Sequence, residues 1–335
     1  MAKGLKITLC VIAVLVGLLL IAVGIYFLWP WNSAFFAKAK KEFAIPGLDT
    51  SFTAQGMTKI DGTNSYIISG YMSDGSASRY YVVDSETQDY YFFTLLVDGD
   101  DYVGHAGGVE VEGNKVWTVS GDDGGHCYCF RLIDVLNASN GDNIEVSGYF
   151  ETNNGADFVF AYGGLLWVGE FHKEGAYDTD ATHHIKTRSG EVNKAVAFAY
   201  IINPFGDDGV ISDVPVKALS IRDLCQGIAV TDDGKFVMST SYSIPDSNIY
   251  CYGNVLDENA HSHISVNGVS VPLWFLDDES LISQTNAPSM AEEIVISEGK
   301  AYILFESACK KYKLVNRKKL SNVYSLDLND LTNQK

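Results

Sequence analysis

Polar side chains able to bind a cation or exchange a proton recur at five matched places in the sequence. Carboxylate and carbonyl oxygens are the ligands that Ca²⁺ prefers. Neighbouring carboxylates can also divide acid and base roles, because the charge of one keeps the other protonated. The first set opens five short apolar runs and consists of Gln55, His105, Asp157, Gln226 and Glu292, with Glu293 beside it. The second set closes the runs that follow and consists of Tyr71, Asp122, Glu170, Tyr242 and Glu306.

The segments that carry these residues repeat one pattern. Each has a short apolar run, a Gly-containing turn, a second apolar run, a polar loop and a third run rich in aromatic residues, which is typical of successive antiparallel strands. The opening positions 55, 105, 157, 226 and 292 are separated by 50, 52, 69 and 66 residues. Such a period indicates a repeat architecture.

A fourth apolar run follows four of the five copies, at 90–97, 144–150, 214–221 and 271–276. The fifth copy has none, but residues 43–45 near the other end of the chain can supply it. Four antiparallel strands per unit, closed by a strand from the opposite terminus, predict an all-β β-propeller without free sheet edges. We predict five four-stranded blades, with six as the alternative. The two longer gaps are too short for another blade and are explained by insertions at about 172–194 and 253–270.

In a propeller, the innermost strand of each blade starts at the face where the second strand ends. The repeat therefore predicts that one channel mouth gathers Gln55, His105, Asp157, Glu170, Gln226, Glu292, Glu293 and Glu306. Three interpretations stay open. In the first, the polar side chains only hydrogen-bond backbone groups and water where the strands converge. In the second, they form a Ca²⁺ site with Asp157 and Glu292 as first ligands. The third interpretation is an acid–base catalytic site whose catalytic residue is unknown. Paired histidines in the insertions, His183-His184 and His261 with His263, are weaker candidates for a transition metal.

Charge and missing motifs exclude several function classes. The chain has 335 residues, of which 24 are basic and 42 are acidic, so its formal net charge is −18. Such a surface repels phosphate backbones, and we exclude nucleic acid as a partner. The sequence contains no nucleophile elbow, phosphate-binding loop or dinucleotide fingerprint.

The first thirty residues predict a membrane anchor. Residues 7–29 contain no charge, follow Lys3 and Lys6, and end among Tyr26, Trp29 and Trp31, the pattern of a spanning helix with an aromatic interface. A cleaved signal peptide is the alternative. We predict a cytoplasmic N-terminus at 1–6, a transmembrane signal-anchor helix at 7–29, a linker at 30–42 and an extracytoplasmic propeller at 43–335.

Several short phrases carry a resemblance: Gln55-Gly56-Met57, Ser69-Gly70-Tyr71-Met72, Gly104-His105-Ala106-Gly107-Gly108-Val109, Gln226-Gly227-Ile228-Ala229-Val230 and Phe305-Glu306-Ser307-Ala308. They look like uncharacterised bacterial membrane-anchored β-propeller proteins. The resemblance implies the fold and the membrane location but transfers no catalytic residue. A remoter likeness is to calcium-binding propeller lactonases of the gluconolactonase and paraoxonase kind, as an analogy of fold only.

These observations favour a tethered binding module that presents one propeller face to a cell-envelope ligand or protein. The alternative is a calcium-dependent hydrolase, lactonase-like or glycosidase-like, with an acidic site at the channel mouth. Glycoside hydrolysis would need two carboxylates roughly 5–10 Å apart.

Overall fold

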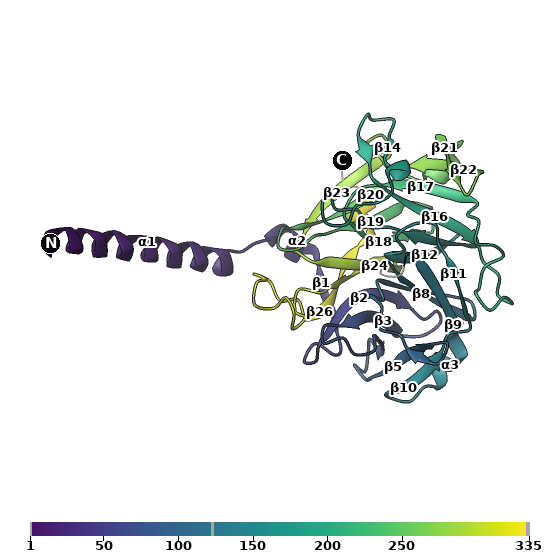
Figure 1. Cartoon of the computed structure of the whole chain (residues 1–335), viewed down its shortest axis with the longest axis horizontal. Helices are drawn as coiled ribbons and strands as arrows, with labels where there is room; N and C mark the ends of the chain where they lie inside the picture. Colours follow the sequence, from purple (N-terminus) through teal and green to yellow (C-terminus); the bar gives the residue numbers. More distant parts are fainter. Residues whose placement is uncertain (1, 122–123, 333–335) are drawn as a thin grey trace.

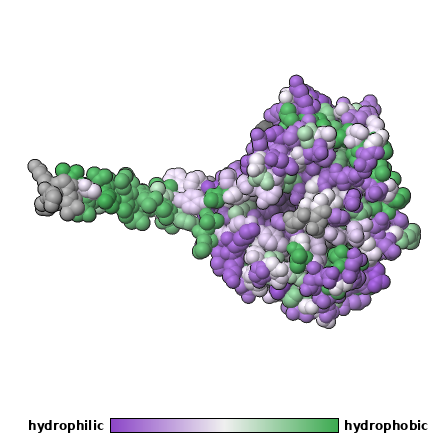
Figure 2. Space-filling view, in the orientation of Figure 1, coloured by the Kyte–Doolittle hydropathy of each residue, from purple (hydrophilic) through white to green (hydrophobic). Residues whose placement is uncertain are grey.

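The computed structural model of the chain describes residues 2–121 and 124–332. A long helix, α1 (Ala2–Leu28), projects from a rounded all-β body (Figure 1). A short helix, α2 (Ser33–Lys38), joins the two. From Ile7 onward the apolar side chains of α1 are mostly exposed, and Figure 2 shows them as a rod of hydrophobic surface beside a largely hydrophilic body. By length and composition this helix can cross a membrane, which fits an anchor.

The body consists of five blades, each built on four antiparallel strands, which confirms the predicted propeller. From the channel outward, blade one is β2 (Phe52–Lys59), β3 (Ser65–Met72), β4 (Arg79–Asp84) and β5 (Tyr90–Val97); blade two is β7 (Gly108–Glu112), β8 (Lys115–Ser120), β9 (His126–Arg131) and β11 (Gly148–Glu151). Blade three is β12 (Phe158–Tyr162), β13 (Leu165–Gly169), β16 (Ala195–Ile201) and β17 (Lys217–Ile221); blade four is β18 (Cys225–Val230), β19 (Phe236–Thr240), β20 (Ser247–Tyr252) and β23 (Leu281–Ala287). Blade five is β24 (Ala291–Ser297), β25 (Lys300–Phe305), β26 (Asn322–Asp327) and β1 (Lys40–Ala44).

Blade five is completed by the N-terminal strand β1, as the sequence predicts for residues 43–45. β1 runs antiparallel to β26, with Lys40 opposite Ser325 and Ala44 opposite Asn322. The folded domain nevertheless starts earlier than predicted, because α2 and most of β1 lie within 30–42, which the sequence predicts to be a linker. The reason is packing: Phe35 is buried, and its ring meets the ring of Phe305 edge to face at 6.1 Å.

The assignment of some outer strands is wrong in the sequence prediction. The run at 271–276, expected to close blade four, forms β22 (Val269–Phe275), which pairs in parallel with β17 of blade three and carries β21 (Ser262–Val266) on its other side. The run at 144–150 is divided between β11 and β10 (Asp142–Glu145), and β10 pairs in parallel with β5 of blade one. An apolar run reveals that a strand is buried but not which sheet edge it will cover.

The remaining elements are short and lie in the connections. They are β6 (Asp100–Asp101), α3 (Leu132–Asn137), η1 (Ala181–His183), β14 (Ile185–Lys186), β15 (Val192–Asn193), η2 (Val255–Asp257) and α4 (Leu328–Thr332). The hairpin of β14 and β15 belongs to the predicted insertion at 172–194, and η2 and β21 belong to the one at 253–270.

The five innermost strands β2, β7, β12, β18 and β24 contact one another in that order and close a ring. Glycine makes this close approach possible. A Cβ at Gly56 would lie 2.7 Å from the Cα of Gly108 on the next blade, and a Cβ at Gly227 would lie 2.0 Å from Oε1 of Glu293. The starts of five strands are thereby held around one channel.

Candidate functional site

A cavity of about 910 Å³ lies at the channel mouth, with walls from all five blades. Seven of the eight residues that the sequence places at this mouth line it: Gln55, His105, Asp157, Glu170, Gln226, Glu292 and Glu306. Tyr71 and Tyr242 of the second set line it too. Asp122 falls outside the described residues. The residues are thus brought together, while their role in binding or catalysis stays a prediction.

Glu293 is the exception. It is buried, its Oε1 accepts the backbone N–H of Ile294 at 3.0 Å, and the side chain packs against Gly227 rather than lining the cavity. Burial raises the pKa of Glu293 well above its ordinary value, with a further contribution from the charge of Glu110. Glu292 lines the cavity and Glu293 does not, at a point where the register of β24 against β25 is irregular.

A network of hydrogen bonds connects side chains of three blades at the cavity wall. Nε2 of His105 donates to Oε1 of Gln55 at 2.6 Å, because an amide oxygen only accepts. Nε2 of Gln55 donates to Oε2 of Glu306 at 2.9 Å. Glu306 in turn accepts a hydrogen bond from the carboxyl group of Glu292. An imidazole, an amide and two carboxyl groups are therefore coupled over a part of the chain that spans 251 residues from Gln55 to Glu306.

The two carboxyl groups at the end of this hydrogen-bond network, those of Glu292 and Glu306, both have raised pKa values. Burial raises the pKa of Glu306 to about 7, although the hydrogen bonds from Gln55 and Glu292 oppose the rise. Burial, followed by the charge of Glu306, raises the pKa of Glu292 well above its ordinary value. The raised pKa favours the protonated form of Glu292, which is the form able to donate a hydrogen bond to Glu306. Groups in direct hydrogen-bond contact are closer than the roughly 5–10 Å of glycosidase carboxylates, so this pair cannot flank a glycosidic bond.

The sequence prediction places His105 at the start of the innermost strand of blade two, but the structure places it in the loop before that strand. Gly108 packs against Gly56, so Gly107, not His105, occupies the place in blade two that Gln55 occupies in blade one. His105 lies earlier, in the loop before β7, and its ring stacks on Tyr71 with 4.8 Å between centroids. Stacking and the Gln55 hydrogen bond, rather than strand register, hold the imidazole at the mouth.

On the side of blade three, Glu170 forms a pair that the sequence does not predict. Its Oε1 accepts from Nδ1 of His183 at 2.8 Å and from the N–H of Val196 at 3.0 Å, and its Oε2 accepts from the N–H of Gly155 at 3.2 Å. The buried carboxylate fixes the tautomer of His183, because Nδ1 must carry the proton. Nε2 is then the ring atom able to accept one, and His183 lines the cavity.

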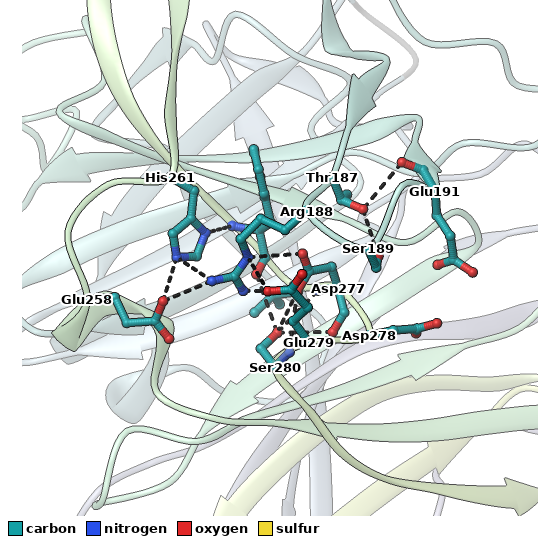
Figure 3. Close-up of polar contacts among 12 residues, drawn as sticks. Thr187, Arg188, Ser189, Glu191, Glu258, His261, Asp277, Asp278, Glu279 and Ser280 are labelled. Atoms are coloured by element: carbon teal, nitrogen blue, oxygen red, sulfur yellow. Dashed lines mark hydrogen bonds and ion pairs between the residues drawn. The ribbon is translucent and has the colours of Figure 1, made fainter.

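The insertion that supplies His183 is clamped onto the neighbouring connection. The guanidinium of Arg188 donates to both carboxylate oxygens of Asp277, at 3.1 and 3.0 Å, and to Glu258 at 2.9 Å (Figure 3). Burial acts to raise the pKa of Asp277, but Arg188 outweighs it and the pKa is lowered. A bidentate pair of this kind is geometrically specific, so it fixes the segment that reaches the cavity wall.

Three of the four paired histidines, His183, His184 and His261, take part in hydrogen bonds. Nδ1 of His261 accepts the N–H of Phe275 at 2.9 Å, and its Nε2 lies 2.8 Å from Glu258 Oε2 and 3.0 Å from Arg188 Nη1, so both ring nitrogens have hydrogen-bond partners. His183 is bonded to Glu170, and Nε2 of His184 lies 3.3 Å from Thr179 Oγ1. Within residues 2–121 and 124–332, no group of three or more His, Cys, Asp or Glu residues is arranged to hold a metal ion.

Calcium binding at Asp157 and Glu292 stays a prediction, and it would require Glu292 to lose its proton. Oδ2 of Asp157 already accepts the N–H of Phe171 at 2.6 Å, and the raised pKa of Glu292 favours its protonated form. A hard cation takes ionised carboxylates. The site would therefore have to release the proton that Glu292 donates to Glu306 before these residues could hold Ca²⁺.

Aromatic rings occupy two sides of the cavity. Phe171, Tyr177 and Tyr242 form a cluster with centroid separations of 5.6 to 6.4 Å where blades three and four meet. Tyr71 and Tyr312 lie on blades one and five, with 3.3 Å between their hydroxyl oxygens. In a ring of five blades, blade one lies opposite the junction of blades three and four. The cavity therefore lies between two aromatic surfaces.

Two buried polar atoms on the cavity wall have no hydrogen-bond partner within the described residues. They are Oγ of Ser241 and Oδ1 of Asn154. Ser241 is also the residue whose carbonyl accepts Nε2 of Gln226, at 3.2 Å. Buried polar groups are nearly always paired with protein or water, and these two atoms are themselves inaccessible to solvent.

Comparisons with known proteins do not identify a family for this chain. No protein-family profile matches the chain. No curated protein matches it by sequence. Among similar solved structures, the PQQ-bound aldose sugar dehydrogenase of Streptomyces coelicolor has 11% sequence identity and a TM-score of 0.41, and the match covers 87% of this chain and 98% of that one. The WD40 β-propeller domain of Doa1 has 14% identity and a TM-score of 0.40, with 86% of this chain and 96% of that one covered. BamB of Moraxella catarrhalis has 9% identity and a TM-score of 0.34, with 82% of each chain covered. All three are β-propellers, but identities and scores this low support no conclusion about this chain. Membership of the anchored bacterial group stays a prediction.

Several cavity residues carried no signal in the repeat. Asn154 and Ser241 precede or follow the repeated positions, and Tyr312 lies between the last two strands of blade five. His183 was visible only as half of a histidine pair in an insertion. A polar residue in an irregular loop has no period to reveal which wall it joins.

Proposed function

We propose that the chain is a membrane-tethered binding module whose channel-mouth cavity takes a small polar ligand that is neutral or positively charged. One observation carries this proposal: the cavity has acidic and amide walls from five blades, and none of its described lining residues is Lys or Arg. An anionic ligand would meet Asp157 and Glu306. Lys311, whose charge acts on Glu306, donates to Tyr71 Oη at 2.6 Å and does not line the cavity. Electrostatic complementarity of this kind selects ligands by sign.

The size and lining of the cavity suit such a ligand. Small-molecule sites usually measure about 300–1,000 Å³ and combine aromatic walls with a few fixed polar groups. Here the aromatic residues Tyr71 and Tyr242 line the cavity together with the polar residues Asp157 and Gln226. Rings of this type stack on sugar faces and attract ammonium groups.

A ligand panel measured on the full chain in detergent micelles tests this function. Three probes differ in charge: a neutral disaccharide, choline and a sugar phosphate. We expect calorimetric binding of the disaccharide or of choline, and none of the sugar phosphate. Binding should weaken at least tenfold in Ser241→Ala and Tyr242→Ala and be unchanged in Glu151→Gln, an exposed residue outside the cavity. Preference for the sugar phosphate, or indifference to both cavity variants, would contradict the proposal.

The tether gives the proposal its location. With Lys3 and Lys6 before α1, we propose that the N-terminus is cytoplasmic and the propeller extracytoplasmic, at the cell envelope. Protease added to intact cells should then digest the propeller. Complete protection until the cells are lysed would reverse this orientation.

A second candidate function, hydrolysis, rests on the Glu292–Glu306 pair. Carboxyl groups that share a proton can activate water: ionised Glu306 would take a proton from water while Glu292 gives its proton to the oxygen of an ester or lactone. A screen of lactones and aryl esters, with and without Ca²⁺, tests it. Turnover that is lost in Glu306→Gln while ligand binding persists would favour hydrolysis over pure binding.

A further inference from the structure

A basic segment stands out in this acidic chain. The segment 309–319, between β25 and β26, has the sequence CKKYKLVNRKK; it holds six of the 24 basic residues of the chain and no acidic one. We call it the basic loop. Its charge of +6 contrasts with the net charge of −18 of the whole chain. A positive surface on an acidic domain attracts anionic partners locally while the rest of the domain repels them.

The basic loop lies against the end of the anchor that is nearest the propeller. Tyr26 of α1 donates its hydroxyl to the carbonyl of Val315 at 3.1 Å, and the Arg317 guanidinium lies 4.5 Å from the centre of the Trp31 ring. Figure 1 shows the loop, in yellow-green, beside this end of α1. Tyr and Trp are the residues that mark the interface of a spanning helix. The loop is therefore at the level where lipid headgroups begin.

The loop presents the side chains that a bilayer surface needs. Leu314 is 81% exposed and Val315 is 49% exposed, at the tip of the loop. Lys310, Lys313 and Lys319 are exposed and form no ion pair with any described residue. The other cations hold the loop in place, as Arg317 pairs with Asp246 and Lys311 donates to Tyr71 Oη at 2.6 Å. An apolar tip flanked by free lysines matches the acyl boundary and the headgroup layer.

We propose that the basic loop docks on the surface of an anionic bilayer, with Leu314 and Val315 at the acyl boundary and Lys310, Lys313 and Lys319 among the headgroups. The anchor keeps the loop at the membrane, so docking needs no encounter from solution. Tyr312 and Val315 also line the channel-mouth cavity. A docked loop therefore brings one rim of that cavity to the bilayer, and the propeller takes a defined orientation instead of swinging on α1.

Spin-label depth measurements on the full chain in lipid nanodiscs test this docking. Leu314→Cys carries the label in a Cys10→Ser background, because the other five cysteines are buried. In discs of phosphatidylcholine with phosphatidylglycerol at low salt, we expect the label to be accessible to oxygen and shielded from an aqueous nickel complex. In discs of phosphatidylcholine alone, or at high salt, the label should become accessible from water.

Two controls make the result specific. Each of Lys310→Gln, Lys313→Gln and Lys319→Gln should lower the ratio of docked to undocked label roughly fivefold, whereas Lys186→Gln, an exposed lysine in the blade-three insertion, should leave it unchanged. A label at Phe205→Cys, where the native side chain is 94% exposed, should stay aqueous in every disc. A Leu314 label that is equally aqueous in all discs, or equally buried whatever the lipid charge, would overturn the proposal.

Discussion

Glu292 donates its carboxyl proton to Glu306 at the wall of the channel-mouth cavity. The first residue belongs to the innermost strand of blade five, and the second follows the strand beside it. Burial holds both pKa values above the ordinary range, so at neutral pH the pair carries less negative charge than two free carboxylates would. Ligand charge, cation binding and stability all depend on this proton.

The stability of the propeller should fall as pH rises through the titration of Glu306. Its pKa is raised from 4.5 to about 7, so between these values the folded state keeps a proton that the unfolded state has lost. The contribution is fully present below pH 4.5 and amounts to about 3 kcal/mol, lost by about pH 7. Urea unfolding of the full chain and of Glu306→Gln across this range measures it. The difference in unfolding free energy between the two should shrink with rising pH; a difference that stays constant would contradict the shared proton.

The close approach of blades four and five at Gly227 should not tolerate a methyl group. A Cβ there would lie 2.0 Å from Oε1 of buried Glu293 and 3.1 Å from its Cα. We expect Gly227→Ala to cost about 1–3 kcal/mol of unfolding free energy. Gly253→Ala is the matched control, because the nearest atom to its Cβ, the carbonyl oxygen of Ser280, is 3.7 Å away. Equal stability of the two variants would refute the packing described for the ring of inner strands.

The closing strand should be a major contributor to stability. Phe43 of β1 is 1% exposed, and its ring lies 4.6 Å from that of Tyr66 in blade one. Phe43→Ala should lower the free energy of unfolding by about 3–5 kcal/mol. Phe205→Ala, on an exposed ring, should change it by less than about 0.5 kcal/mol. Thermal unfolding of both variants checks the comparison, and a small effect at Phe43 would argue against closure by β1.

Calcium binding at Asp157 and Glu292 can be tested through its linkage to the same proton. A hundredfold excess over the dissociation constant should stabilise the fold by about 2.7 kcal/mol. Because Glu292 must lose its proton to become a ligand, the rise in melting temperature should be larger at pH 8 than at pH 6. Asp157→Asn and Glu292→Gln should abolish the rise. No calcium-dependent rise at either pH would reject calcium as a ligand.

Much of the architecture was predictable because it follows from local periodicity in the sequence. The repeated strand–turn–strand pattern identified five blades, and the apolar residues at 43–45 identified the closing strand. Once the fold is a ring of blades, the start of the first strand and the end of the second must share a face. That rule was enough to bring Gln55, Asp157 and Glu292 to one cavity.

The contacts that give the cavity its chemistry arise only in the tertiary structure. The sequence alone determined that the starts of the innermost strands reach the channel mouth, since strand period is a property of neighbouring residues. It could not determine that Glu170 holds His183, that β22 covers the edge of blade three, or that the basic loop meets Tyr26 of the anchor. Each of these joins an irregular loop or a sheet edge to a distant partner, and such pairings are selected by space, charge and unpaired backbone groups that exist only after the blades have assembled.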